Sequence, residues 1–447
     1  MQLTNSALSM LLKRYRAVLF KCRTLNWLGG TVLAAGLVLG AASGAQAALP
    51  DESWVTWNSE TEATNPATPD WQTKGLKITE GANITLTDAH GYAGIALQMD
   101  GGTVTIAGGD GTSWYTPSLF GYGAEADAND ATPAATTLSG GTVNIVRGSF
   151  GAGLTGDGAQ TKDYQFNIAG GNVNFQGARQ YDAVMLVTST ATAKTALAIS
   201  DGAVTVAAGK FGAIDAPHGN VAVTGTGSLN AQGQLDLIAG GLAADGTYTP
   251  PEGISVTPPV DGATKFSISG GGTLTVGGQG ALNLHQNVAL AVAADGVLRN
   301  AGTINVGVEG SENASLDVSK VSNALDALIG DGGSVVVAGT DERSALYVGD
   351  LAISTDQLAA SRTAGKIALG PKGGISASGT LTLSGSTLAL GVNDTVGAGR
   401  LHAKTLTLAD DPRRWADPPW RQRRRPQRQP DAEQRGCPLC RTAPGFQ

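Results

Sequence analysis

A short phrase recurs along most of this 447-residue chain. It consists of an aliphatic residue, a small residue, a glycine-containing turn and a strand in which aliphatic residues alternate with Thr or Asn. The copies lie at 79–86, 100–106, 138–145, 168–175, 199–206, 268–276, 301–306 and 378–383. Successive side chains of a strand point to opposite faces, so each copy predicts a half-buried strand. One such strand cannot bury its aliphatic face, and we therefore expect the copies to stack.

The spacing of the copies indicates how they stack. Val143, Val173 and Val204 occupy one position of the phrase and are 30 or 31 residues apart, as are Leu274 and Ile304, whereas other intervals range from 20 to 45. Coils of unequal size accept loop insertions, unlike propeller blades of fixed length. We predict an all-β fold, a right-handed parallel β-helix (β-solenoid) with loop insertions and on the order of 15 coils. An antiparallel sandwich is the structural alternative.

Composition also favours one extended repetitive body. The chain has 64 glycines, about twice the usual ~7%, while charged residues make up 15%. Glycine within a strand costs about 0.5–1 kcal/mol relative to alanine, so this abundance indicates many tight turns. Residues 48–410 hold 16 Lys or Arg and 33 Asp or Glu, a net charge of -17. Such a body would repel phosphate, so we expect no nucleic-acid partner.

The first 47 residues have the pattern of an extended signal peptide. An apolar run from Leu28 to Leu39 follows a basic region, and Ala45-Gln46-Ala47 supplies the small residues of a cleavage site. We predict passage through the Sec translocon and cleavage between Ala47 and Ala48. A membrane anchor is the alternative, but the apolar run is shorter than the ~20 residues of a span. Translation from Met10 would give a signal of more usual length. We expect no integral membrane segment in the mature chain.

Three stretches interrupt the repeat. Residues 48–73, with Trp54, Trp57 and Trp71, are predicted to be an N-terminal cap over the first coil, or else an exposed aromatic ligand patch. Residues 109–135, rich in aromatic residues, are expected to form a projecting loop. Residues 315–330 show helix-like spacing of apolar residues and predict a short flanking helix. The repetitive body itself is expected to run from 74 to 410.

The last segment, 411–447, differs abruptly in composition. It contains nine Arg and seven Pro but no Val, Ile or Tyr, and it cannot continue a strand ladder. We expect a basic Pro/Arg-rich tail that is disordered or frameshifted. A shifted reading frame in a GC-rich gene would produce this composition. The alternatives are a basic tail for anionic envelope polymers, or a metal or redox site at Cys437 and Cys440, which supplies only two ligands.

No catalytic constellation emerges from the sequence, and we expect no enzyme, cofactor or metal. The histidines, at 90, 218, 285 and 402, are far apart, and neither GxSxG nor GDSG occurs. Several aspartates adjoin glycine, among them Asp110, Asp157, Asp261, Asp295 and Asp331. Carboxylates on successive turns can bind calcium, but Asp-Gly is above all a turn dipeptide and the nonapeptide repeat of calcium-binding β-rolls is missing.

The signal, the repeated GGTVTI-like strands and a body without cysteine together resemble the passenger region of an autotransporter (type V secretion). The resemblance covers roughly residues 1–410 and implies a β-helical passenger, 74–410, displayed at the cell surface. The C-terminal β-barrel of that family would need strands of about ten alternating residues, and this sequence has none. The product is thus expected at the outer membrane or outside the cell, or trapped in the periplasm.

The resemblance also implies a role in adhesion, aggregation or biofilm formation, with host or bacterial surface glycans or proteins as partners. Loops at 109–135 and 240–265 are the segments expected to display such a function. One alternative is a polysaccharide-degrading enzyme, which would need carboxylates clustered roughly 5–10 Å apart on one face. The other is an inert spacer that holds a functional tip away from the membrane.

Overall fold

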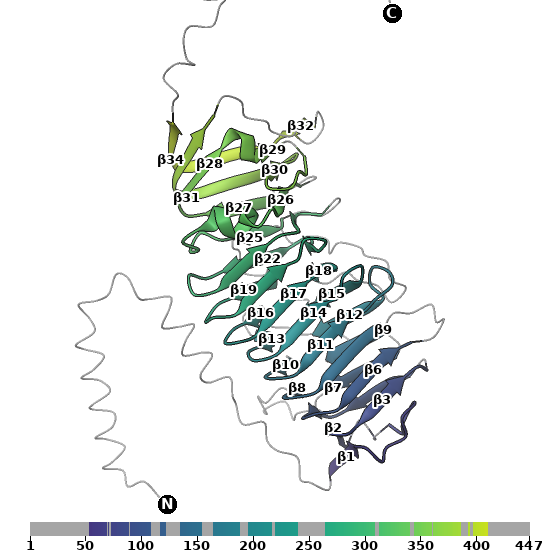
Figure 1. Ribbon diagram of the computed structural model, residues 1–447. Coiled ribbons are helices and arrows are strands. Elements are labelled where there is room, and N and C mark those ends of the chain that lie inside the picture. The colour runs from purple at the N-terminus through teal and green to yellow at the C-terminus, as the bar shows by residue number, and fades with distance from the viewer. Residues whose placement is uncertain are drawn as a thin grey trace, which may run out of the picture.

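The computed structural model describes residues 53–68, 70, 73–88, 90–108, 117–121, 135–153, 164–187, 195–216, 220–239, 264–308, 313–339, 344–359, 361–385, 392–393 and 397–409. They form a rod of short parallel strands that stack along one axis, from β1 at one end to β34 at the other (Figure 1). Residues 1–47, in which a signal peptide is expected, the expected cleavage residues Ala45, Ala47 and Ala48, and the tail 411–447 lie outside the described residues.

Each regular coil contributes one strand to each of three parallel sheets. Sheet A stacks β1 (Trp54–Trp57), β2 (Gly75–Ile78), β5 (Leu97–Met99), β8 (Ala135–Leu138), β10 (Gln165–Ile168), β13 (Thr195–Ile199), β16 (Asn220–Val223), β19 (Thr264–Ile268), β22 (Val288–Val292), β25 (Ser315–Asp317), β27 (Ser344–Val348) and β31 (Gly373–Ser384). The second half of β31 also pairs with β28 (Leu351–Ser354). β34 (Arg400–Ala409) pairs with both halves of β31.

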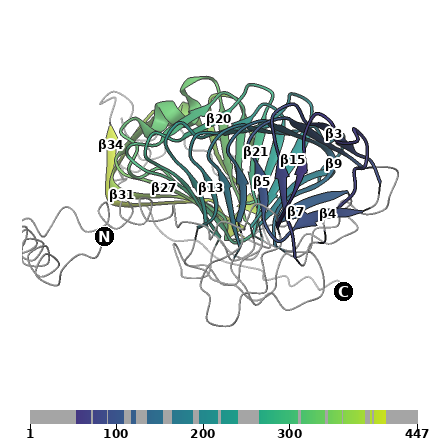
Figure 2. The same cartoon turned by 90° about the horizontal axis from the view of Figure 1, so that it is seen from below.

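Sheets B and C form the other two walls. Sheet B stacks β3 (Asn83–Leu86), β6 (Thr103–Ala107), the first half of β9 (Thr142–Ala152), β11 (Asn172–Phe175), β14 (Ala203–Val206), β17 (Ser228–Ala231), β20 (Thr273–Val276) and β23 (Val297–Asn300). Sheet C stacks β4 (Gly91–Gly94), β7 (Ser118–Gly121), the second half of β9, β12 (Ala183–Val187), β15 (Phe211–Asp215), β18 (Gln234–Ile238), β21 (Ala281–Leu284), β24 (Thr303–Val306), β26 (Ser334–Val337), β30 (Ile367–Leu369) and β29 (Leu358–Ala359). Figure 2 views the rod from the end that carries β3 and β4.

The core is a set of aliphatic rows that run along the rod. In sheet B, Val143, Val173 and Val204 are direct register partners on successive strands, and the row continues through Leu229 and Leu274. All five side chains are fully buried, and burial of each contributes about 1.5–3 kcal/mol. The predicted all-β parallel β-helix is therefore confirmed, with the alternating aliphatic positions facing inward.

Glycine recurs between sheets A and B because stacked turns approach closely there. Gly141 has a φ of +82°, and a Cβ at this position would lie 2.6 Å from the carbonyl carbon and oxygen of Gly101 in the coil before. Gly171 repeats the conformation one coil later, with a φ of +72°. The Gly-Gly pairs of the repeated phrase are thus required for two reasons. The turn needs a positive φ, and the neighbouring coil leaves no space for a side chain.

Two expectations about the later coils were wrong. Ile304 does not stack on Leu274, because β24 belongs to sheet C and pairs Ile304 with Leu282, while Leu298 takes the place above Leu274. Residues 315–330 are not one helix. They begin with strand β25 and end in a short π-helix, η3 (Asp326–Gly330). The first part is a strand because Leu316 stacks on Leu290, in the row of inward side chains of sheet A.

The N-terminal segment adds the outermost strand of sheet A. β1 lies parallel to β2, and Thr64 forms an isolated bridge to Thr85. The Trp57 side chain is buried and meets the Tyr92 ring edge-on, with centroids 5.9 Å apart. The described elements also include η4 (Thr355–Gln357) and the antiparallel pair β32 (Val392–Asn393) and β33 (Gly397–Ala398). Across the described ranges, every helix is too short or too polar to traverse a bilayer.

Candidate functional site

The outer face of sheet A carries a groove of about 450 Å³ near the C-terminal half of the rod. It extends over five stacked strands, β19, β22, β25, β27 and β31. Its lining residues are Lys265, Phe266, Ser267, Ala289, Leu290, Ala291, Ser315, Asp317, Ser319, Tyr347, Val348, Ser376 and Ser378. Most are small, so the backbone of the sheet forms a recessed floor.

The floor follows from the register of the strands. Ser267, Ala291, Asp317 and Tyr347 are successive register partners on neighbouring strands, and all face outward because the residues between them face the core. Ala291 leaves space between its larger neighbours. The hydroxyl of Ser267 donates a hydrogen bond to the backbone carbonyl oxygen of Val221 at 3.2 Å, so it lies close to the sheet. The groove therefore combines an apolar floor with hydroxyl, carboxylate and ammonium groups at its margins.

Tyr347 and Asp317 are the chemically distinctive pair of this groove. Burial raises the pKa of Tyr347 to about 12, and the negative charge of Asp317 adds to the shift. The phenol therefore stays protonated over the physiological range and can donate a hydrogen bond. Asp317 accepts a bond from the backbone N–H of Ser319 at 2.8 Å, which fixes its carboxylate beside the groove.

A second polar cluster lies on the outward side of sheet C and is covered. The Asp236 carboxylate is fully buried and accepts hydrogen bonds from Asn283 at 2.7 Å and Gln234 at 3.0 Å. The Nε2 atom of His285 lies 3.0 Å from the same carboxylate. Asn305 extends the network by donating to Asn283 at 2.7 Å. Because Asp236, Asn283 and His285 are buried and are joined by hydrogen bonds through Asp236, we interpret the cluster as structural support rather than as a ligand site.

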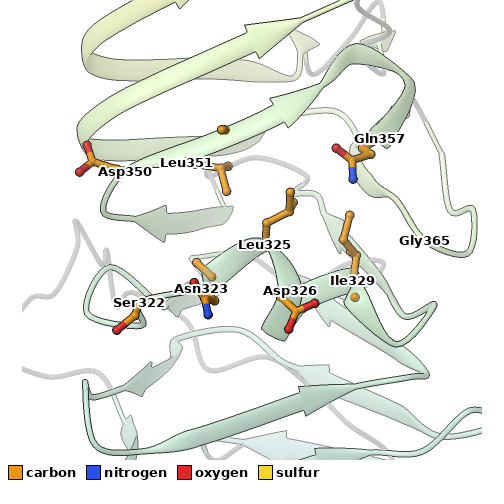
Figure 3. A pocket seen from close by; sticks show the side chains of 12 residues that line it. Ser322, Asn323, Leu325, Asp326, Ile329, Asp350, Leu351, Gln357 and Gly365 are labelled. Carbon is orange, nitrogen blue, oxygen red and sulfur yellow. The ribbon is translucent and has the colours of Figure 1, made fainter.

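A cavity of about 490 Å³ lies where sheet B is interrupted (Figure 3). Between β25 and β26 the chain forms η3 in place of a sheet B strand, and β28 follows in the next coil. Leu325, Ile329 and Leu351 give the cavity apolar walls, while Asp326 and Asp350 lie on its opposite sides. The carboxylate of Asp350 accepts a bond from the backbone N–H of Thr380 at 2.6 Å, so it stabilises the neighbouring coil.

The histidines and Asp-Gly residues are dispersed in the structure. His90 is exposed, with its Nδ1 atom 2.8 Å from Asp88, His285 belongs to the buried cluster, and His402 is exposed on β34. Asp295 occupies a turn, where its carbonyl oxygen accepts from the backbone N–H of Gly271, and Asp331 ends η3. His218, Asp110, Asp157 and Asp261 lie outside the described residues, as do most of the loops 109–135 and 240–265. No group of three or more metal-binding side chains forms within the described ranges.

Neither the groove nor the buried pair of Asp236 and His285 was predicted from the sequence. The two residues of the pair are 49 positions apart. The available signal was a polar residue at an outward position of two aliphatic strands, Asp236 in QLDLI and Asn283 in ALNL, the latter lying two residues before His285. The groove had a comparable signal in the small outward residues of β22, but its depth depends on which strands become neighbours.

Comparison of the chain with protein families, with curated proteins and with solved structures gives no match.

Proposed function

We propose that this chain is the rod-shaped passenger of an exported bacterial surface protein and that it acts in adhesion. The pattern of its first 47 residues supports export, and the resemblance to autotransporter passengers supports display at the cell surface. The observation that carries the adhesive part of the proposal is the groove on sheet A. It provides a recessed and accessible site on the side of a rod, where a ligand on another cell or on a matrix can reach it.

A glycan is the ligand whose chemistry fits the groove best. A sugar ring offers an apolar C–H face and an edge of hydroxyls. The apolar face can pack on the floor at Ala291 and on the ring of Tyr347. The hydroxyls can form hydrogen bonds with Asp317, Lys265 and the Tyr347 hydroxyl. Binding sites of this kind are mostly apolar, with a few polar groups that fix orientation. Hydrolysis is less favoured, because Asp317 is the only carboxylate among the described residues that line the groove, and glycosidases use two.

The test is glycan binding by the purified chain on an array of bacterial and host surface glycans. We expect at least one class to bind and Tyr347→Ala to weaken that binding about tenfold or more, which corresponds to ~1.4 kcal/mol. The matched control is Asn167→Ala, because Asn167 lies in the same outward row of sheet A but outside the groove. Binding to no glycan, or equal loss in both variants, would contradict the proposal and favour an inert spacer.

Export has a separate test. The mature protein recovered from the periplasm or the cell surface is expected to begin at Ala48. An N-terminal sequence that retains Leu28 to Leu39 would instead support a membrane anchor.

A further inference from the structure

Within the part of the chain that the structure describes, the C-terminal end of the rod presents an open strand edge. β34 pairs with β31 along one edge, and within the described residues no strand pairs with its other edge. Leu406 and Leu408 on this strand are 55% and 59% exposed, the only large apolar side chains among the described residues with such exposure. Open edges of this kind are templates for pairing with another chain.

The exposed leucines occupy core positions. β31 buries Ile375, Ala377, Leu381 and Leu383, and their register partners on β34 are Leu401, Ala403, Leu406 and Leu408, in that order. The four β34 side chains therefore continue the inward rows of the rod by one further level. Leu401 and Ala403 are partly buried against the core, while the two leucines beyond them are open to solvent.

The strand is complementary to a second copy of itself. Consider two β34 strands that pair antiparallel about a two-fold axis between Lys404 and Thr405. Leu408 of one copy then lies opposite Leu401 of the other, and Leu406 lies opposite Ala403. Residues that lie opposite each other in an antiparallel pair point to the same face of the sheet. The inward side chains of one copy therefore lie next to the inward side chains of the other copy.

Charge supports the same register. In this pairing Arg400 lies opposite Ala409, His402 opposite Thr407 and Lys404 opposite Thr405, so no base faces another base. A slip by one residue would place Lys404 opposite itself and Leu406 opposite His402. Like charges directly opposite each other destabilise a sheet. A slip by one residue also places inward side chains opposite outward ones. Only the first register therefore pairs all four inward side chains with inward side chains of the second copy.

The sequence that follows β34 lacks the alternating pattern of a strand of this rod. Its nine Arg and seven Pro do not alternate with aliphatic residues, and each proline lacks the N–H that a ladder needs. We propose that two copies of the chain join end to end through antiparallel pairing of their β34 strands, which buries Leu406 and Leu408 of both. Such a contact is symmetric, so it stops at two copies.

Sedimentation velocity of the full chain over a range of concentrations tests the proposal. We expect a monomer–dimer equilibrium, and we expect Leu406→Asp together with Leu408→Asp to weaken the dimer by more than about 100-fold. The substituted side chains are exposed, so the circular dichroism spectrum should not change. The control is Thr56→Asp on the exposed surface of β1, at the opposite end of the rod. A chain that stays monomeric, a dimer that survives the leucine substitutions, or a loss of association in Thr56→Asp would overturn the proposal.

A disulfide tests the register. His402→Cys with Thr407→Cys, in a chain whose cysteines at 22, 437 and 440 are replaced by serine, should form a covalent dimer on mild oxidation. His402→Cys alone should not, because position 402 faces position 407 of the second copy. A covalent dimer of equal yield in both variants would contradict the register.

Discussion

The side-chain amide of Asn300, the last residue of β23, donates to the backbone carbonyl oxygen of Leu328 in η3 at 2.8 Å. The same amide donates to the carbonyl oxygen of Ser334 at 3.0 Å, and its own oxygen accepts from the N–H of Gly302 at 3.1 Å. Asn300 thus joins the last strand of sheet B to the helix that replaces the next one. It is 1% exposed, so water does not compensate these bonds if they are lost.

We therefore predict that Asn300→Ala lowers the free energy of unfolding by about 2–4 kcal/mol, because buried carbonyl and N–H groups lose their partners. Asn144→Ala is a suitable control. Asn144 is only partly buried and accepts from Asn174 on the next coil at 3.0 Å, so its loss should cost about 1 kcal/mol or less. Urea denaturation followed by circular dichroism measures both. Equal effects would show that Asn300 does not anchor η3.

The stacked turns predict a contrast between two glycines. Gly141→Ala should destabilise the rod by several kcal/mol, because its Cβ would overlap the backbone of Gly101. Gly209 also has a positive φ, +69°, but a Cβ there meets nothing within 4 Å, so Gly209→Ala should cost only about 1–2 kcal/mol. Thermal unfolding of the two variants compares them, and a smaller loss at Gly141 would contradict the turn geometry.

Tyr347 gives the groove a spectroscopic signature. Its phenolate should appear only near pH 12, and Asp317→Asn should lower that pKa towards the ordinary value of 10.0 because it removes a negative charge. Folding retains the Tyr347 proton between pH 10 and 12, so this contribution to stability is present below pH 10 and is lost as pH rises through about 12. The difference in phenolate absorbance between the protein and Tyr347→Phe isolates this group. An unchanged pKa in Asp317→Asn would contradict the coupling.

The buried cluster on sheet C predicts a large cost for the loss of its carboxylate. Asp236→Ala would leave Asn283, Gln234 and His285 without their shared partner, and we expect it to cost about 3 kcal/mol or more. Asp201→Ala removes an exposed carboxylate that accepts from Thr226 at 2.9 Å and should change stability by less than about 0.5 kcal/mol. If the two variants unfold at the same urea concentration, the cluster does not support the rod.

Much of the architecture was accessible from local pattern. Alternation in strands such as Thr142–Ile145 identified the inward residues, and the Gly-Gly pairs identified the turns, because both depend on backbone geometry within a few residues. The spacing of Val143, Val173 and Val204 even identified neighbours in space. The same reasoning misplaced Ile304, since a strand of sheet C and one of sheet B carry the same alternation and differ only in their position along the coil.

The groove and the rod's open end required the tertiary structure. Ser267, Ala291, Asp317 and Tyr347 line one groove only because their strands are register neighbours, and the intervals between those strands vary with the loops that connect them. Likewise, Leu406 resembles every other inward leucine in its local sequence. Its exposure depends on whether another strand stacks above it. The sequence by itself thus determined which residues face inward and where the chain turns, while stacking decided which side chains meet, because neighbours in a solenoid are one coil apart and coil length is not encoded locally.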